Sequence, residues 1–228
     1  MVVLATKLYV EGEARERSLD SLRSLVTNEI GELDAEFEIG IRHDDFPSVT
    51  IDGDDATVAR NVLREEFGEI VPDLQAGDTY VGTLESWDED GFVLDAGQGD
   101  GVRIPTDELG LGPGSATQIR ERYGLVQHLP LRFVYGGADG EEPSRLAETE
   151  QDRLYEWTRG DGRLNVNSAT RAEVRATLNR AGHAQDYVTV ERLGLLEQSV
   201  ICTENTDPPG LLASVGEYLP AELRCVVP

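Results

Sequence analysis

The sequence predicts an α+β protein of three units: an N-terminal β-α-β-β-α layer, a small central β-barrel and a C-terminal α+β unit. Apolar residues recur at helical spacing in some stretches and alternate with polar residues in others, a pattern typical of mixed helices and strands. Turn signals rich in Gly and Asp separate these stretches. The predicted units cover residues 1–72, 73–137 and 143–228, and a chain of 228 residues is long enough for two or three small cores.

The first unit is predicted to be a small layer of strands and helices. Its elements are a strand at 2–10, a helix at 14–30, strands at 36–42 and 48–51, and a helix that starts at Asp54 or Asp55 and ends at Gly68. It has no Gly-rich loop suited to phosphate, and its turn at 53–55 is acidic. We therefore interpret this unit as a packing domain with a solvated acidic surface, in preference to a direct RNA-binding domain.

The central unit carries the pattern on which the functional interpretation depends. Gly82 interrupts its first strand, and a glycine inside a strand marks a sharp bend of the kind found at a barrel corner. The pair Asp90-Gly91 accepts the positive φ angles of a tight hairpin. The predicted elements are strands at 80–87, 92–96, 102–105 and 129–135 and a helix at 115–122.

This order of strands, turns and glycines resembles the OB-fold RNA-binding domains of the ribosomal-protein type, which also occur in exosome cap subunits and in the alpha subunit of archaeal initiation factor two. The residues that carry the resemblance are Gly77, Gly82, Leu84, the run Gly91–Asp95, Gly101, Ile104 and Leu109. The resemblance implies an OB barrel that binds RNA. The whole chain is also similar to a family of archaeal proteins of unknown function from halophiles, and that likeness implies no activity.

The chain departs from the RNA-binding pattern of the domains that it resembles. There, bases stack on aromatic residues on both sides of the hairpin glycine, and a histidine follows in the third strand; this chain has Asp90, Val93 and Arg103 instead. Each lost stack removes about 1–3 kcal/mol. The candidate nucleic-acid contacts are Trp87, Arg103 and Arg132. Equally compatible with the sequence, Trp87 packs between domains and Arg103 forms a surface salt bridge.

The C-terminal unit is predicted to mix short helices and strands. Thr170 and Glu173 fit a capping box at the start of one helix. Cys202 and Cys225 are predicted to lie on neighbouring strands as buried thiols without a disulfide. The other predicted elements are helices at 145–159, 186–193 and 208–219 and strands at 163–166, 198–203 and 222–227.

Arg171 and Arg175 lie one turn apart on the capped helix and form a second candidate nucleic-acid surface. The stretch 164–174 resembles the first half of a helix-hairpin-helix DNA-binding motif. The Gly-apolar-Gly hairpin that would follow is replaced by residues 179–183, so the nest of backbone amides for phosphate is missing. We therefore favour a capped packing helix whose arginines pair with nearby acids.

Charge is the strongest compositional signal. The chain has 44 acidic and 20 basic residues, a net charge of −24, and all but one of its cations are arginines. The acidic excess is spread over all three units, which indicates adaptation to a salty cytoplasm in preference to a dedicated acidic tail. The alternative is an acidic surface that binds cations or mimics nucleic acid. No signal peptide or membrane-spanning run is expected, so a cytoplasmic protein is predicted.

Catalytic and cofactor motifs are missing from the sequence. His43, His128 and His183 are far apart and have no metal-ligand spacing, and no phosphate-binding loop, dinucleotide fingerprint or nucleophile elbow is present. We predict no catalytic residue, no metal and no cofactor.

We therefore predict a non-enzymatic factor of a halophilic archaeon that binds RNA or a ribonucleoprotein such as the ribosome through the central barrel. The alternative is a protein-protein interaction scaffold whose barrel has lost its affinity for RNA. A third hypothesis, an enzyme, requires a pocket that holds a histidine beside a carboxylate or a cysteine.

Overall fold

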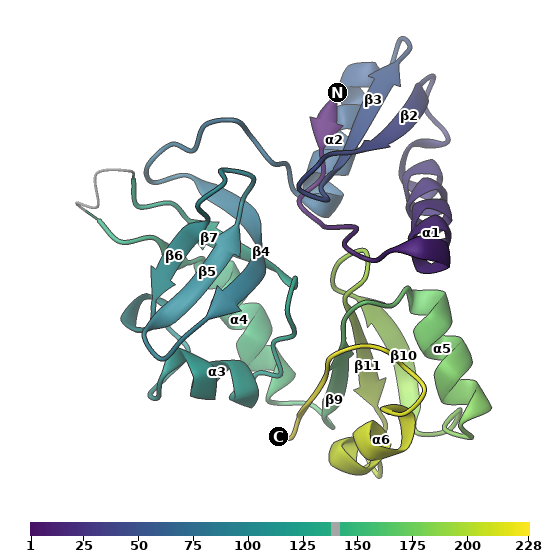
Figure 1. The fold of residues 1–228 in the computed structure, drawn as a ribbon, viewed down its shortest axis with the longest axis vertical. Coiled ribbons are helices and arrows are strands. Elements are labelled where there is room, and N and C mark those ends of the chain that lie inside the picture. Colours follow the sequence, from purple (N-terminus) through teal and green to yellow (C-terminus); the bar gives the residue numbers. More distant parts are fainter. Residues whose placement is uncertain (138–141) are drawn as a thin grey trace.

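The computed structural model describes residues 1–137 and 142–228, and it confirms a mixed α+β protein with three antiparallel sheets. In Figure 1 the N-terminal part lies at the upper right, the central part at the left and the C-terminal part at the bottom. Each sheet has its own apolar core. Over the described ranges, none of the helices combines the length and the apolarity needed to cross a bilayer.

The N-terminal part has the predicted β-α-β-β-α order. Its elements are β1 (Val2–Val3), α1 (Gly12–Ile30), β2 (Glu36–Ile41), β3 (Pro47–Asp52) and α2 (Ala56–Phe67), with the strands in the order β1-β3-β2. The apolar stripe of α1 packs with β3 and α2 in one core. The predicted strand at 2–10 is shorter than expected, because after Val3 only Leu4 bridges to Glu69 and the chain then leaves the sheet.

The central part is a five-stranded sheet with two α-helices. Its strands follow the order β6-β5-β4-β7-β8, and the edge strands β6 and β8 are not hydrogen-bonded neighbours in it, so the predicted closed barrel is not confirmed. The elements are β4 (Thr79–Trp87), β5 (Gly91–Asp95), β6 (Val102–Pro105), the 3-10 turn η1 (Thr106–Glu108), α3 (Ala116–Arg122), β7 (Pro130–Val134), β8 (Arg145–Leu146) and α4 (Glu148–Trp157).

The central core continues past the predicted boundary between the central and C-terminal units, at residues 137–143. β8 returns to pair with β7, and α4 contributes Leu154 and Trp157 to the same core as β4 and β5. The structure thus places α4 with the central sheet, whereas the sequence-based division assigned this helix to the C-terminal unit. Gly82 in β4 serves close packing, because a Cβ there would lie 3.1 Å from Cβ of Leu94 and 3.2 Å from the Phe133 ring.

The C-terminal part has four strands in the order β10-β11-β9-β12. Residues 186–193 were predicted to be helical, and that prediction is wrong: they contain strand β10, in which the β-formers Tyr187 to Val190 pair with β11. The predicted capping box of Thr170 and Glu173 is confirmed. The elements are β9 (Arg163–Val166), α5 (Arg171–Arg180), β10 (Tyr187–Arg192), β11 (Gln198–Cys202), α6 (Pro208–Val215) and β12 (Leu223–Val226).

The two cysteines do not lie on neighbouring strands, as the sequence had suggested. β9 runs between β11, which carries Cys202, and β12, which carries Cys225. Both thiols are free; Cys202 is buried as predicted, whereas Cys225 is only partly buried. The prediction of a direct β11-β12 pair is wrong because the short strand β9 takes the central place in this sheet.

Two extended segments join the three parts. Residues 4–8 leave the N-terminal sheet and are buried, and the N–H of Leu195 donates to Oγ1 of Thr6 at 2.9 Å. The loop after β10 also contributes Leu195 and Leu196 to the N-terminal core. The C-terminal part therefore completes the packing of the N-terminal part.

Backbone strain gathers around Leu8 and Tyr9, at the end of the first of these segments and directly after it. Among the described residues, those other than glycine with positive φ are Asp45, His128 and Ser168. The Asp45 carbonyl accepts from Leu8, the His128 ring packs on Tyr9, and the Ser168 N–H donates to the Tyr9 hydroxyl. One residue of each part is thus held in an unfavoured conformation against the same segment.

Candidate anion-binding site

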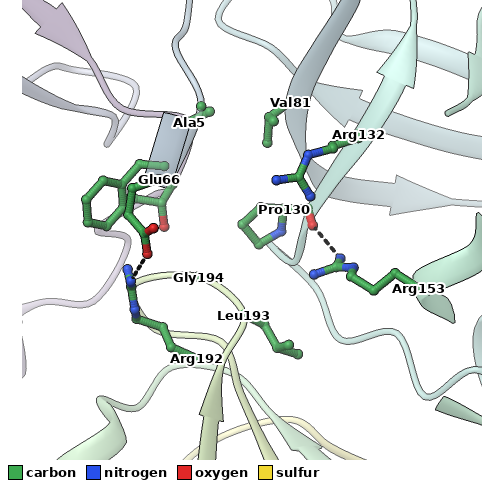
Figure 2. A pocket seen from close by; sticks show the side chains of 12 residues that line it. Ala5, Glu66, Val81, Pro130, Arg132, Arg153, Arg192, Leu193 and Gly194 are labelled. Atoms are coloured by element: carbon green, nitrogen blue, oxygen red, sulfur yellow. Dashed lines mark hydrogen bonds and ion pairs between the residues drawn. The ribbon is translucent and has the colours of Figure 1, made fainter. Parts of the chain in front are cut away.

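A cavity of about 160 Å³ lies where the three parts of the chain meet. Its walls come from residues 5–6 and the end of α2, from β4, β7 and α4, and from the end of β10 with the loop that follows (Figure 2). Two glycines, Gly68 and Gly194, allow the backbones of the N-terminal and C-terminal parts to lie close to the central part at this cavity. A Cβ at Gly68 would lie 2.9 Å from the Val81 side chain, and one at Gly194 would lie 3.0 Å from the Pro130 ring.

Two arginines of the cavity come from the central part. Leu131 and Phe133 of β7 face the core, so strand alternation turns Arg132 outward. Arg153 lies on α4, one turn after Glu150, and its Nε donates to Oε1 of that carboxylate at 2.7 Å. The backbone N–H of Arg132 donates to Oε2 of Glu150 at 3.1 Å. The carboxylate of Glu150 is fully buried; it holds the guanidinium of Arg153 and the backbone of Arg132, and it lies 3.8 Å from Nη1 of Arg132.

The third arginine comes from the C-terminal part. Arg192 ends β10 and forms an ion pair with Glu66 of α2 (Figure 2). Its guanidinium also lies over the Phe67 ring, 4.9 Å from the ring centroid. This pair ties the N-terminal and C-terminal parts together across the cavity.

The charges around the cavity favour an anion. The guanidinium groups of Arg132, Arg153 and Arg192 face the carboxylates of Glu66 and Glu150, which leaves one positive charge in a chain with a net charge of −24. The lining holds no His, Cys, Ser or Lys. Guanidinium groups carry paired N–H donors that match the oxygens of a phosphate or a carboxylate, so the cavity suits the binding of such an anion.

A wider groove of about 320 Å³ adjoins the cavity and shares Gly68, Val81 and Arg132 with it. It runs between the end of α2 and the first residues of β4, and it adds Arg64, Glu69 and Tyr80 to the lining. The groove and the cavity together form the arginine groove, with Arg132 at the junction.

Three family models divide the chain among them. The DUF2110 N-terminal domain matches residues 1–73, the DUF2110 central domain matches residues 74–158, and the DUF2110 C-terminal domain matches residues 161–227. The chain belongs to the DUF2110 family. No curated protein matches the sequence. The arginine groove thus draws its residues from all three DUF2110 domains.

Of the five candidate residues chosen from the sequence, Arg132 is the one that lines the groove. Arg103 is half-exposed and donates to both carboxylate oxygens of Asp88, at 2.8 and 3.0 Å. The Trp87 ring lies 3.4 Å from the guanidinium of Arg120. That arginine is paired with Glu222 of the C-terminal domain, so one ring face is already covered at a domain contact.

Arg171 and Arg175 are exposed on α5 and lie outside the groove lining. The structure therefore does not bring the five candidates together. Sequence reasoning missed Arg64, Arg153 and Arg192, because each stands in an ordinary helix or strand. Only the packing of the three DUF2110 domains makes them neighbours.

A chain of polar contacts lies at the boundary of the N-terminal and central domains. Nζ of Lys7 pairs with Asp95 at 2.6 Å and with Glu85 at 3.0 Å. Burial opposes the charge of Lys7, but hydrogen bonds to the two carboxylates outweigh it and raise the pKa. Nδ1 of His128 lies 3.4 Å from Oε2 of Glu85, and His128 and Lys7 together hold the pKa of Glu85 down to about 2.

His128 with Glu85 is one histidine–carboxylate pair that bears on the enzyme hypothesis, and the C-terminal domain holds another. His183 bonds through Nδ1 to Asp186 and through Nε2 to Oγ of Ser214, both at 2.6 Å. Ser214, however, lies near the C-terminal end of α6, where backbone carbonyls disfavour a serine alkoxide. The three residues lie outside the arginine groove. We interpret them as a structural contact that links the start of β10 to α6.

In the described ranges, no cluster of His, Cys, Asp and Glu has the make-up of a metal site.

Proposed function

We propose that the protein is a non-enzymatic RNA-binding factor whose arginine groove holds the phosphate backbone. The observation that carries this proposal is the surplus positive charge of Arg132, Arg153 and Arg192 around a cavity of a strongly acidic chain. A single-stranded backbone supplies singly charged phosphates, and guanidinium groups bind them through paired N–H donors.

An OB-like reading of the central domain is part of this proposal. β4, β5 and β6 form a meander, α3 follows β6, and the edge strands β6 and β8 approach each other. Tyr80, on β4, offers an aromatic ring in the groove beside Arg64 and Arg132. We place the protein in the salty cytoplasm of a halophilic archaeon, where the even acidic excess keeps it soluble.

Fluorescence anisotropy with a labelled single-stranded RNA tests the proposal. Arg132→Gln is expected to weaken binding and to lower the slope of log K against log salt by about 0.7, the loss of one phosphate contact. Arg171→Gln removes the same charge from α5 and serves as the matched control, with an unchanged slope. RNA binding that is absent in the wild type, or lowered equally by both variants, would refute the groove as the RNA site.

A protein-interaction scaffold is the second candidate. It is favoured by the engagement of Trp87 with Arg120 and of Arg103 with Asp88, which leaves these two side chains less available for bases. Affinity purification with and without nuclease separates the two candidates. A partner that survives nuclease treatment supports the scaffold, and one that is lost supports RNA binding.

A further inference from the structure

Two carboxylates pair with the arginines of the cavity, and they differ in how firmly they are held: Glu66 is part of the lining, whereas Glu150 is not. Glu150 is fully buried and accepts from Arg153 and from the backbone of Arg132. The side chain of Glu66 is 39% exposed, and its partner in the cavity is Arg192. The Glu66 carboxylate already contacts solvent, so it can turn away from Arg192 at a smaller cost than the fully buried Glu150.

The charge of the cavity therefore depends on Glu66. With Glu66 in place, three guanidinium groups face two carboxylates and the surplus is one positive charge. With Glu66 turned away, the three face Glu150 alone and the surplus is two. A phosphomonoester carries about −1.5 to −2 at pH 7, whereas a phosphodiester carries one charge.

The shape of the cavity suits the end of an RNA chain better than its middle. The cavity is more enclosed than the groove that leads into it. Its volume of about 160 Å³ is well above the about 10–15 Å³ that one water needs, so a phosphate group fits. An RNA backbone that lies along the groove past Tyr80 and Arg132 would place its last phosphate in the cavity, because the groove leads into the cavity at Arg132.

We propose that the cavity binds the terminal phosphate of an RNA, and that this phosphate displaces Glu66 from Arg192. The RNA part of this inference rests on the proposed function. The bound phosphate accepts from Arg132 and Arg192, and Glu66 acts as a competing anion that belongs to the chain itself.

The experiment compares one RNA oligonucleotide with a 5′-phosphate, with a 3′-phosphate and with hydroxyls at both ends, by competition in fluorescence anisotropy. The wild type is expected to prefer one phosphorylated end by about tenfold. Glu66→Gln should increase that preference several-fold, because it removes the competitor. Arg192→Gln should abolish the preference, and Arg192→Lys, which keeps the charge, should retain part of it.

Glu65→Gln is the matched control. It removes the same charge one residue away on the exposed surface of α2, outside the cavity lining, so it should leave the preference unchanged. Equal affinity of the wild type for all three oligonucleotides would overturn the inference and leave the proposed function standing.

Inorganic phosphate, titrated by calorimetry, separates the two possible sources of the ligand. Failure of every RNA to bind, with phosphate binding that Glu66→Gln strengthens and Arg192→Gln abolishes, would overturn the proposed function and the RNA end but support the phosphate cavity. Failure of both RNA and phosphate to bind would overturn both proposals.

Discussion

The hydroxyl of Tyr9 donates to Oε1 of Glu197 at 2.7 Å and links the N-terminal domain to the C-terminal domain. The same hydroxyl accepts from the backbone N–H of Ser168 at 2.9 Å. Glu197 is fully buried, and its second oxygen, Oε2, has no hydrogen-bond partner among the described residues. Burial raises the pKa of Glu197 to about 8, so the carboxyl group is protonated at neutral pH.

Glu197 makes the stability of the fold depend on pH. In the unfolded chain the carboxyl group ionises near its ordinary pKa of 4.5, whereas in the folded chain it keeps its proton to about pH 8. Its contribution is therefore complete below pH 4.5 and is lost as the pH rises to about 8, by up to about 1.4 kcal/mol per pH unit. Denaturant unfolding of the wild type and of Glu197→Gln at several pH values measures this. The stability of the wild type relative to the variant should fall between pH 5 and 8, and a constant difference would contradict the prediction.

Lys7 is the sole lysine of the chain, and the folded structure should protect it from amine reagents. Its side chain is 9% exposed and is held by Asp95 and Glu85. An acylating reagent should therefore modify Lys7 much more slowly in the native protein than in urea-treated protein. Mass spectrometry of digests from native and urea-treated protein gives both rates. Rapid labelling of Lys7 in the native protein would show that the boundary between the first two domains opens readily.

Thr170→Ala should destabilise α5 by about 1 kcal/mol, because the hydroxyl that caps the N–H of Glu173 is lost. Glu173 also pairs with Arg17 of α1 at 2.9 Å, so the contact between the first and third domains weakens as well. Thermal unfolding of the variant measures the loss. The control is Thr177→Ala on the same helix, which removes a hydroxyl without removing a cap and should change stability by less than about 0.5 kcal/mol.

Leu196→Ala should destabilise the N-terminal domain, although Leu196 belongs to the C-terminal domain in the sequence. The side chain is fully buried in the N-terminal core, so the substitution should cost about 2–5 kcal/mol. Hydrogen exchange should accelerate in α1. Leu178→Ala, in the C-terminal core, is the control: it should cost a similar free energy without a selective effect on α1. Unchanged exchange in α1 of the Leu196 variant would contradict the packing described here.

Local signals in the sequence were sufficient for much of the fold. The capping box of Thr170 and the helical apolar stripe of α1 depend on residues a few positions apart, and both were predicted correctly. β10 was mistaken for a helix because its short apolar pattern is ambiguous, and its pairing with β11 decides the matter. The order of strands around Cys202 and Cys225 likewise depends on long-range pairing that no local pattern records.

Most residues of the candidate site could not be predicted from the sequence. Arg132 was chosen for its place on a predicted strand, and it does line the groove. Its neighbours Arg153 and Arg192 lie 21 and 60 positions further along the chain. Their proximity arises from the packing of three domains, and that packing depends on buried contacts such as Leu195 to Thr6, which have no periodic signature.

The loop that carries Leu195 and Leu196 has a consequence for biosynthesis. Translation proceeds from the N-terminal end toward the C-terminal end, so the first domain leaves the ribosome more than a hundred residues before the two leucines that complete its core are made. The nascent N-terminal segment must therefore wait, incompletely packed, until most of the polypeptide has been synthesised. Residues that the family models assign to the first and the third domain thus reach their native packing together, near the end of synthesis.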